Sequence, residues 1–158
     1  MRLTTRGRYA VMAMVELAQR QAPASGPASA PVSLGEIAAA QLISLAYLEQ
    51  LFGPLRRAGL VASARGAQGG YRLARAPSLI AIASIVEAVD EPIRATRCEE
   101  GSPGCMAGRR CRTHDLWAEL GEQIRLFLDG MTLADVVEGR VLGRAAAPTA
   151  EAPALTGR

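Results

Sequence analysis

A glycine-rich turn between two short β-forming runs limits the possible folds of this chain more than any other feature. The runs are Leu60 to Ala64 and Tyr71 to Leu73, and the turn between them reads Arg65-Gly66-Ala67-Gln68-Gly69-Gly70. A strand, a glycine-rich turn and a second strand predict a β-hairpin. Because helical patterns precede and follow this hairpin, we expect a mainly α fold with one small β element.

Three helices are predicted before the hairpin. The first runs from about Thr5 to Gln19, and the second opens at Ser33 with Glu36 three residues later, the pattern of a capping box, and continues to Ala40. The third follows Ser44, a good N-cap, and Gly59 is suited to end it. The apolar faces expected from helical spacing are Tyr9, Met12, Val15 and their neighbours in the first helix, and Leu45, Leu48, Leu51, Phe52 and Leu55 in the third. The order helix, helix, helix, hairpin is that of a winged helix-turn-helix.

The second half predicts more helices. Pro77 breaks the chain, and a helix is expected from Ser78 to Val89, ended by Asp90-Glu91-Pro92, with the apolar stripe Leu79, Ile82, Ile85, Val86 and Val89. A long helix capped by Thr113 is expected to reach about Asp129, and a short one to span Met131 to Val137. The apolar residues of the long helix are spaced by 3, 4 and 3 residues, which predicts a dimerisation helix; packing on the chain's own core is the alternative. These residues are Trp117, Leu120, Ile124 and Phe127.

These elements predict three parts: a winged helix-turn-helix DNA-binding domain over residues 1–76, a metal-binding loop with dimerisation helices over 77–138, and a disordered Ala/Pro/Gly-rich tail over 139–158. The first 76 residues contain nine arginines and three glutamates, a net charge of +6, whereas the rest carries −3. This asymmetry favours a first half that faces nucleic acid. The opening residues show no signal-peptide pattern, and the longest apolar run, Leu79 to Val86, is too short to span a bilayer. We therefore expect a cytoplasmic protein without a membrane partner.

All three cysteines and the only histidine of the chain fall within one short stretch, with the spacing C-x6-C-x5-C-x2-H. Thiolate sulfur and imidazole nitrogen are the ligands of zinc and iron–sulfur sites. In a reducing compartment, clustered cysteines more often bind metal or act in redox chemistry than form disulfides. We interpret the stretch as a metal or cluster site, with inert thiols or one disulfide and a spare cysteine as the alternative. The candidate ligands are Cys98, Cys105, Cys111 and His114.

The third helix is the expected DNA-reading helix, because residues near the start of such a helix face base edges in the major groove. Its exposed candidates are Ser44, Ala46, Tyr47, Glu49 and Gln50. Gln can pair with adenine through two hydrogen bonds, and Glu can accept a hydrogen bond from the amino group of cytosine. Glu49 could also be an ordinary solvated side chain on the helix surface.

Arg65 begins the hairpin turn, where Gly66, Gly69 and Gly70 keep the backbone thin. A narrow minor groove attracts an inserted arginine, so Arg65 is the candidate for that contact, with a solvated turn arginine as the alternative. Other arginines of the first half are expected to contact phosphates, which adds affinity and salt dependence without sequence information. They are Arg2, Arg6, Arg8, Arg56 and Arg57.

Four segments together resemble the Rrf family of winged-helix transcription factors. They are Met1 to Ala10, Ile43 to Leu51, Arg65 to Tyr71, and the three cysteines with His114, in the same order and over roughly residues 1–138. The resemblance implies a homodimer that reads a two-fold DNA site with Tyr47, Glu49, Gln50 and Arg65. It also implies a [2Fe–2S] cluster on Cys98, Cys105, Cys111 and His114, and regulation of iron–sulfur assembly genes by cluster occupancy.

The chain departs from the family pattern at several points. The first cysteine spacing is one residue longer than usual, Ala46 stands where Ser is common, and the loop from Ala22 to Pro31 is enlarged. Gly53-Pro54 lies inside the third helix, where we expect a kink or an early end because proline removes a backbone hydrogen bond.

Other functions remain open from the sequence. Within the family, the chain could be a nitric oxide or redox sensor with a different fourth ligand; a structural zinc site is a further alternative. A metal-storage or scaffold protein would leave the basic first half without a purpose. No Ser/His/Asp set, P-loop or dinucleotide fingerprint is present, so we do not expect an enzyme.

Overall fold

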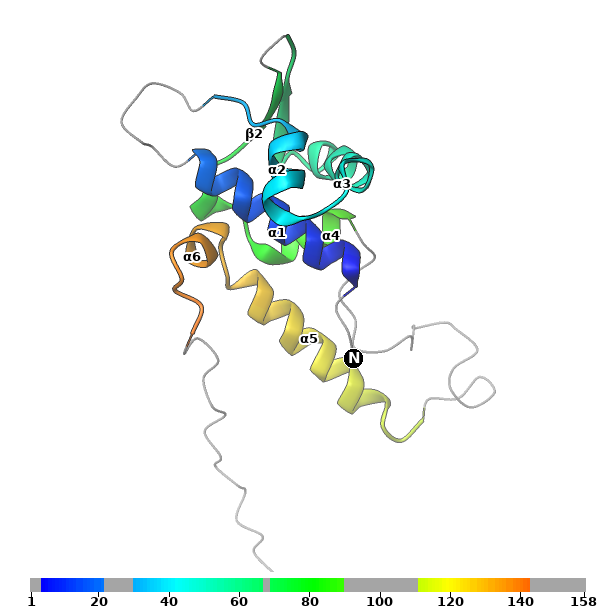
Figure 1. The fold of residues 1–158 in the computed structure, drawn as a ribbon. Helices are drawn as coiled ribbons and strands as arrows, with labels where there is room; N and C mark the ends of the chain where they lie inside the picture. The colour runs from blue at the N-terminus through cyan, green and yellow to red at the C-terminus, as the bar shows by residue number, and fades with distance from the viewer. Residues whose placement is uncertain (1–3, 22–29, 67–68, 90–110, 143–158) are drawn as a thin grey trace, which may run out of the picture.

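The computed structural model describes residues 4–21, 30–66, 69–89 and 111–142. Over these residues the predicted mainly α fold with one β-hairpin is confirmed (Figure 1). The first three helices and the hairpin agree with the predicted ranges to within about two residues. The elements are α1 (Thr5–Gln21), α2 (Leu34–Gln41), α3 (Leu45–Arg57), β1 (Val61–Ala64), β2 (Gly70–Leu73), the 3-10 helix η1 (Pro77–Leu79), α4 (Ile82–Val89), α5 (His114–Asp129) and α6 (Leu133–Val137).

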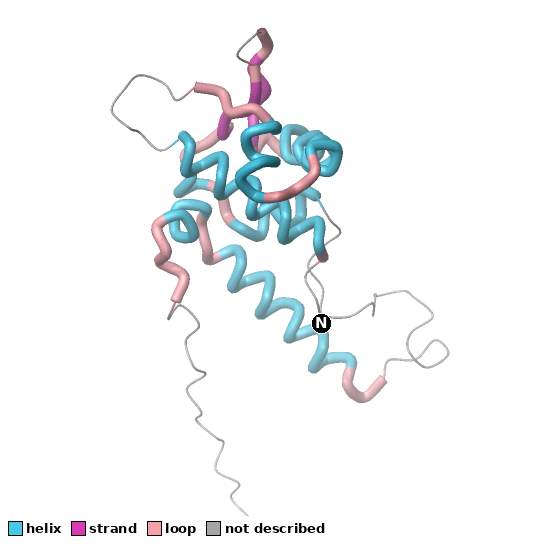
Figure 2. Tube along the Cα trace, viewed as in Figure 1, coloured by secondary structure: helices cyan, strands magenta, loops and turns pink. Residues whose placement is uncertain are grey.

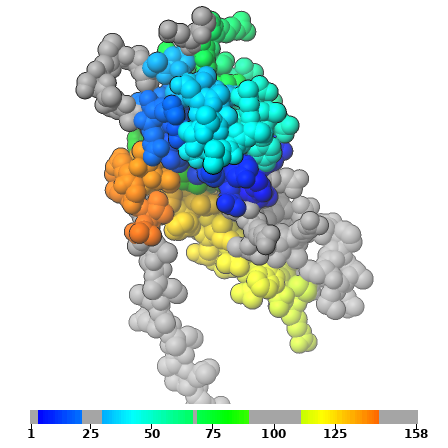
Figure 3. Space-filling view, viewed as in Figure 1, coloured from blue at the N-terminus to red at the C-terminus, as the bar shows by residue number. Residues whose placement is uncertain are grey.

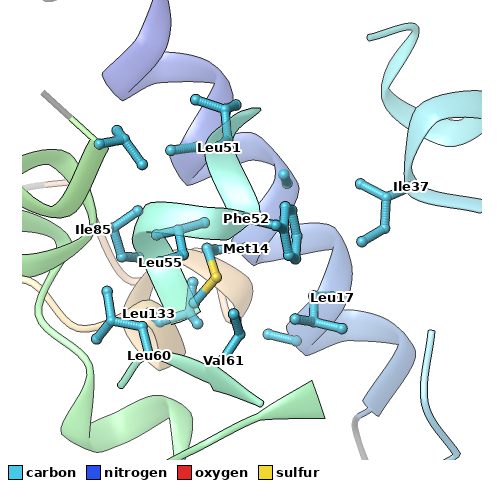
Figure 4. Packing of buried hydrophobic residues seen from close by; sticks show 14 of the residues in the cluster. Met14, Leu17, Ile37, Leu51, Phe52, Leu55, Leu60, Val61, Ile85 and Leu133 are labelled. Carbon is cyan, nitrogen blue, oxygen red and sulfur yellow. The ribbon is translucent and has the colours of Figure 1, made fainter. Parts of the chain in front are cut away.

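One hydrophobic core joins the helices on both sides of the hairpin. Met14 and Leu17 of α1 meet Phe52 and Leu55 of α3, and Ile85 and Leu133 pack into the same cluster (Figure 4). Because burial of each such side chain contributes about 1.5–3 kcal/mol, this cluster holds α4 and α6 firmly against the winged-helix part. The core thus includes residues on both sides of residue 77, the predicted boundary between the DNA-binding part and the metal-binding part.

The three apolar residues named for α1 pack against the core, but the fully buried positions of α1 are their neighbours. Tyr9, Met12 and Val15 are only half-buried, whereas small residues such as Ala10 and Ala13 are fully buried. The reason is the close approach of α4: a Cβ atom on Gly7 would lie 3.2 Å from Val86 Cγ1. The contact therefore selects small side chains, which a pattern of large apolar residues does not reveal.

The hairpin forms the wing and projects from the helical body, at the end away from α5 (Figure 2). Strands β1 and β2 are antiparallel, with Val61 opposite Leu73 and Ala64 opposite Gly70. Val32 forms an isolated bridge to β2, because its backbone N–H donates to Tyr71 O at 2.9 Å and its carbonyl accepts from Tyr71 N at 2.8 Å. At the base of the wing, β2 is therefore bonded on one edge to β1 and on the other edge to Val32.

The single helix predicted from Ser78 to Val89 is wrong at its start. The chain forms η1 and then an extended stretch, in which Ala81 pairs with Thr132. Ile82 N donates to Met131 O and Leu133 N donates to Ile80 O, both at 2.8 Å. These bonds to a distant segment take the backbone groups that a helix would use, and they leave Leu79, predicted to be buried, 71% exposed.

The structure contradicts two predictions for α3, its early end at Pro54 and the burial of Leu45. The helix continues past Pro54 to Arg57, so the predicted early end is wrong, and Ala58 N donates to Pro54 O at 2.9 Å. Gly59 then adopts a φ of 67°, which suits glycine and ends the helix as predicted. Leu45 is 48% exposed because it lies in the first turn, where solvent still reaches the apolar stripe.

Two expectations fall mostly outside the described residues: the stop at Asp90-Glu91-Pro92 and all but the first four residues of the tail at 139–158. Of the helices in the described ranges, none is long and apolar enough to cross a membrane.

Candidate DNA-reading surface and metal centre

The helix-turn-helix is built from two capped helices. Helix α2 begins with the predicted capping box: Ser33 Oγ accepts from Glu36 N at 3.2 Å, and Glu36 Oε2 accepts from Ser33 N at 2.9 Å. The hydrogen bond from the Ser33 hydroxyl, at 2.7 Å, is the main cause that lowers the pKa of Glu36 below its ordinary value of 4.5. A short turn then leads to α3, whose predicted cap is confirmed because Ser44 Oγ accepts from Tyr47 N at 3.3 Å.

Leu42 occupies the turn between these helices in an unusual conformation. Its φ of 54° and ψ of 39° lie in the left-handed region, and its side chain is 93% exposed. Leucine avoids this region because its Cβ crowds the following carbonyl. The turn is thus set by its neighbours, chiefly by buried Ile43, whose N–H donates to Ala38 O at 3.2 Å.

The structure brings the predicted reading residues onto one surface of α3. Ser44, Ala46, Glu49 and Gln50 are all exposed, and α2 and α3 lie side by side on the molecular surface (Figure 3). Tyr47 differs from them because it is half-buried, and its ring packs edge-on against the ring of Tyr9. This role of Tyr9 is not visible in the sequence, since no local pattern relates two residues 38 positions apart.

Arg65 lies where the wing turns, and its side chain is exposed. The turn depends on glycine: Gly66 has a φ of 113°, and its carbonyl accepts from Gly69 N at 2.9 Å. A Cβ atom on Gly69 would lie 2.8 Å from Ala64 O. Larger residues would therefore distort the tip that carries Arg65.

The predicted phosphate contacts are exposed where the structure describes them. These are Arg6, Arg8, Arg56 and Arg57, whereas Arg2 lies outside the described residues. Arg72 in β2 and Arg75 after it are also exposed. They were not among the predicted phosphate contacts. The alternation of β2, in which Tyr71 and Leu73 are half-buried and Arg72 is exposed, was the signal that could have identified Arg72.

Two of the four predicted metal ligands are described. Cys111 and His114 are both half-buried at the start of α5, and His114 N donates to Cys111 O at 3.1 Å. This turn brings the sulfur-bearing and imidazole-bearing residues to the same helix end. Cys98 and Cys105 lie outside the described residues. Among the residues that the structure describes, no three His, Cys, Asp or Glu residues form a metal-binding group.

Thr113 stands at the N-cap position of α5, but its side chain makes no capping hydrogen bond. Its Oγ1 atom lies 3.5 Å from Cys111 Sγ instead. The predicted cap is therefore wrong in its hydrogen bonding, and the hydroxyl faces a candidate ligand. A thiolate and an imidazole separated by one turn suit a zinc or iron–sulfur site, so the described half of the ligand set fits such a group.

Helix α5 shows an apolar face that the rest of the described chain leaves open. Trp117, Leu120 and Phe127 are 39%, 37% and 39% exposed, and Leu116 and Leu126 are exposed as well. On the same helix, the hydrogen bond from Arg125 to Glu122, at 2.7 Å, lowers the pKa of Glu122 and raises that of Arg125. Of the four apolar residues predicted to form the dimer seam, Ile124 alone is half-buried by the described part of its own chain.

Curated relatives and solved structures resemble this chain over most of its length. The transcriptional regulator IscR of Yersinia pseudotuberculosis is 49% identical over 140 residues, which cover 89% of this chain and 81% of the relative. A putative HTH-type transcriptional regulator of Azotobacter vinelandii is 50% identical over 137 residues, covering 87% and 79%. Both are named as regulators of transcription and not as enzymes.

Solved structures agree with the fold. The structure of CymR, the global cysteine regulator of B. subtilis, superposes with a TM-score of 0.71 at 34% identity, covering 88% of this chain and 98% of that one. The structure of T. potens IscR gives 0.69 at 37% identity, covering 89% and 88%. The model of the Rrf2 family, described as iron-dependent transcriptional regulators, matches residues 3–139. The chain therefore belongs to the Rrf2 family of transcriptional regulators.

Proposed function

We propose that this regulator binds double-stranded DNA in the cytoplasm as a homodimer on a two-fold operator, and that it senses iron–sulfur cluster status. In this proposal a [2Fe–2S] cluster is held by Cys98, Cys105, Cys111 and His114, and its occupancy controls iron–sulfur assembly genes. The winged-helix part reads DNA, and the segment after residue 77 reports cluster status to it.

The turn from Cys111 to His114 is the observation that carries the cluster part of the proposal. It holds a thiol and an imidazole at one helix end, joined by a backbone hydrogen bond of 3.1 Å. The Rrf2 match and the similarity to proteins named IscR support iron as the metal. Such a cluster supplies a reversible change in charge and occupancy.

Histidine ligation suits a sensor. Replacing one thiolate by neutral imidazole reduces the negative charge around a cluster and raises its potential. Because imidazole can also be protonated, the cluster becomes easier to lose. His114 starts α5, the helix that carries the open apolar face, so loss of the ligand acts on the element expected at the dimer interface.

The DNA part rests on exposed side chains of α3 and of the wing. Glu49 and Gln50 of α3 supply groups that pair with cytosine and adenine edges, while Arg65 is exposed at the wing turn and suits a minor groove. Exposed arginines lie on α1, α3 and β2, and the first 76 residues carry a net charge of +6. These charges favour phosphate contacts and salt-dependent affinity.

The homodimer is supported by α5. Solvent-exposed tryptophan, phenylalanine and leucine side chains spaced as in a helix pair gain stability when a second copy covers them. A two-fold dimer would place two wings and two α3 helices on successive half-sites.

The first test is an ultraviolet–visible spectrum of the full chain purified without oxygen, with iron, sulfide and zinc assays on the same sample. Visible absorption with about two irons and two sulfides per chain is the expected result for this cluster type. A colourless protein with about one zinc would overturn the cluster proposal in favour of a structural metal. DNA binding with and without the cluster then tests the sensing role.

A variant pair separates the ligands from the helix that carries them. His114→Ala should lose the native spectrum, while Gln123→Ala, an exposed change on the same helix, should keep it. A native spectrum in His114→Ala would remove histidine from the ligand set and favour a redox or nitric oxide sensor with another fourth ligand.

A further inference from the structure

We propose that Gln21 is a positioning residue for DNA binding, which fixes the wing relative to α3 and so sets the distance between the minor-groove and major-groove contacts. The inference rests on the proposed DNA binding and adds a residue that does not itself touch DNA. Gln21 is the last residue of α1 and is half-buried, far from the wing in sequence but next to it in space.

The carboxamide of Gln21 pairs with the backbone of β2 through both of its polar atoms. Its Nε2 donates to Tyr71 O at 3.3 Å, and its Oε1 accepts from Leu73 N at 2.9 Å. One side chain thus replaces the donor and the acceptor that a neighbouring strand would offer. Only an amide of this length satisfies both groups, because a carboxylate has no donor and an alkyl chain has neither.

Val32 completes the same edge of β2. Its N–H and carbonyl pair with Tyr71, so Tyr71 O accepts hydrogen bonds from both Val32 and Gln21. The strand approaches so closely that a Cβ atom on Gly70 would lie 2.4 Å from Val32 O. The outer edge of the wing is therefore tied to the body at two points, and one of them is a single side chain.

The other side of β2 is attached to the reading helix. The ring of Tyr71 packs against the ring of Phe52, with centroids 4.8 Å apart and planes at 62°. Phe52 is fully buried in α3, three residues after Glu49. Strand β2 is thus held between α3 through its aromatic ring and α1 through Gln21, and the two attachments together define its direction.

The direction of β2 matters because Arg65 lies at the far end of the hairpin. Four residues of strand span about 13 Å, so a rotation of about 10° at the base moves the tip by about 2 Å. Hydrogen bonds weaken over much smaller displacements. A two-stranded hairpin alone is only marginally stable in water, so the groups at its base decide where its tip lies.

The test compares Gln21→Ala and Gln21→Glu with Gln19→Ala, an exposed glutamine two residues earlier on α1. Affinity is measured on a duplex selected from a random library by the full-length protein purified without oxygen, and again in the Arg65→Ala background. Loss of the Gln21 bonds should weaken specific binding about two- to ten-fold, as for one or two ordinary hydrogen bonds, while Gln19→Ala should match the parent. In the Arg65→Ala background the same change should have a much smaller effect, since the wing then keeps only the phosphate contact expected of Arg72.

Equal losses in both backgrounds would overturn the positioning role and leave Gln21 as a merely stabilising residue. Thermal unfolding of each variant checks that the chain still folds. Hydrogen exchange at the Leu73 amide needs no DNA: faster exchange in Gln21→Ala would support the contact, and unchanged exchange would contradict it. Failure of the parent protein to bind any duplex would instead overturn the proposed function, so the two failures are distinguishable.

Discussion

The ring of Tyr47 packs edge-on against the ring of Tyr9, with centroids 5.8 Å apart and planes at 85°. Tyr47 belongs to the first turns of α3, and Tyr9 to α1, so this contact joins the reading helix to the first helix of the chain. It holds part of the half-buried Tyr47 side chain against the protein and leaves the remainder for solvent or DNA.

Tyr9→Ala should weaken binding at the preferred DNA site, because Tyr47 loses the ring that orients it. An aromatic pair of this geometry contributes about 0.5–1.5 kcal/mol beyond its buried area, which is the size of loss expected. Fluorescence anisotropy with a labelled duplex measures it, and Tyr9→Phe, which keeps the ring, is the control. Full affinity in Tyr9→Ala would mean that α3 alone orients Tyr47.

Arg65→Ala should reduce affinity for the preferred site by about 1–3 kcal/mol, because the wing loses its groove contact. Arg72→Ala is the matched control on the same wing and should weaken preferred and random duplexes equally, as a phosphate contact does. A competition assay with both duplexes separates these outcomes. Equal losses for the two variants on both duplexes would reduce Arg65 to a phosphate contact.

Glu49→Ala should relax base preference without abolishing binding, since Glu49 is an exposed acceptor that also repels phosphates. Selection from a random duplex library, repeated with the variant, reports the preference at each position. An unchanged selected site would place Glu49 outside base reading.

Leu42→Gly should increase the free energy of unfolding by up to about 1 kcal/mol. The left-handed backbone costs leucine about 1–2 kcal/mol and costs glycine little, although the flexibility of glycine in the unfolded chain offsets part of the gain. The lost side chain is 93% exposed and contributes little burial. Urea unfolding measures the change, and a less stable variant would show that Leu42 makes a contact worth more than its backbone strain.

The capping box of α2 predicts a pH dependence of stability. The pKa of Glu36 is lowered in the folded protein, chiefly by the hydrogen bond from Ser33. The stability it provides is therefore present above the ordinary value of 4.5 and is lost as the pH falls through the lower folded pKa. The difference in unfolding midpoint between the parent and Glu36→Gln should shrink over that window, and a constant difference would contradict it.

Local chemistry explains the parts of the fold that the sequence predicted. Ser33 with Glu36, Ser44 before α3 and Gly59 after it each act through bonds or φ angles within a few residues, so their patterns are visible in the chain itself. The exposed reading residues followed from the same helix periodicity. The clustered cysteines and His114 pointed to a metal, although only two of the four lie in the described part of the chain.

Patterns in the sequence predicted the order of the helices, the caps of α2 and α3, the hairpin and the family. Tertiary packing sets which faces are buried and which distant groups meet. These are α4 against Gly7, the bridge from Ala81 to Thr132 that shortens the predicted helix, and the contacts of Tyr9 and Gln21. Caps and turns depend on neighbours along the chain, whereas these contacts depend on groups from 38 to 79 positions away, where packing and backbone pairing override local preference.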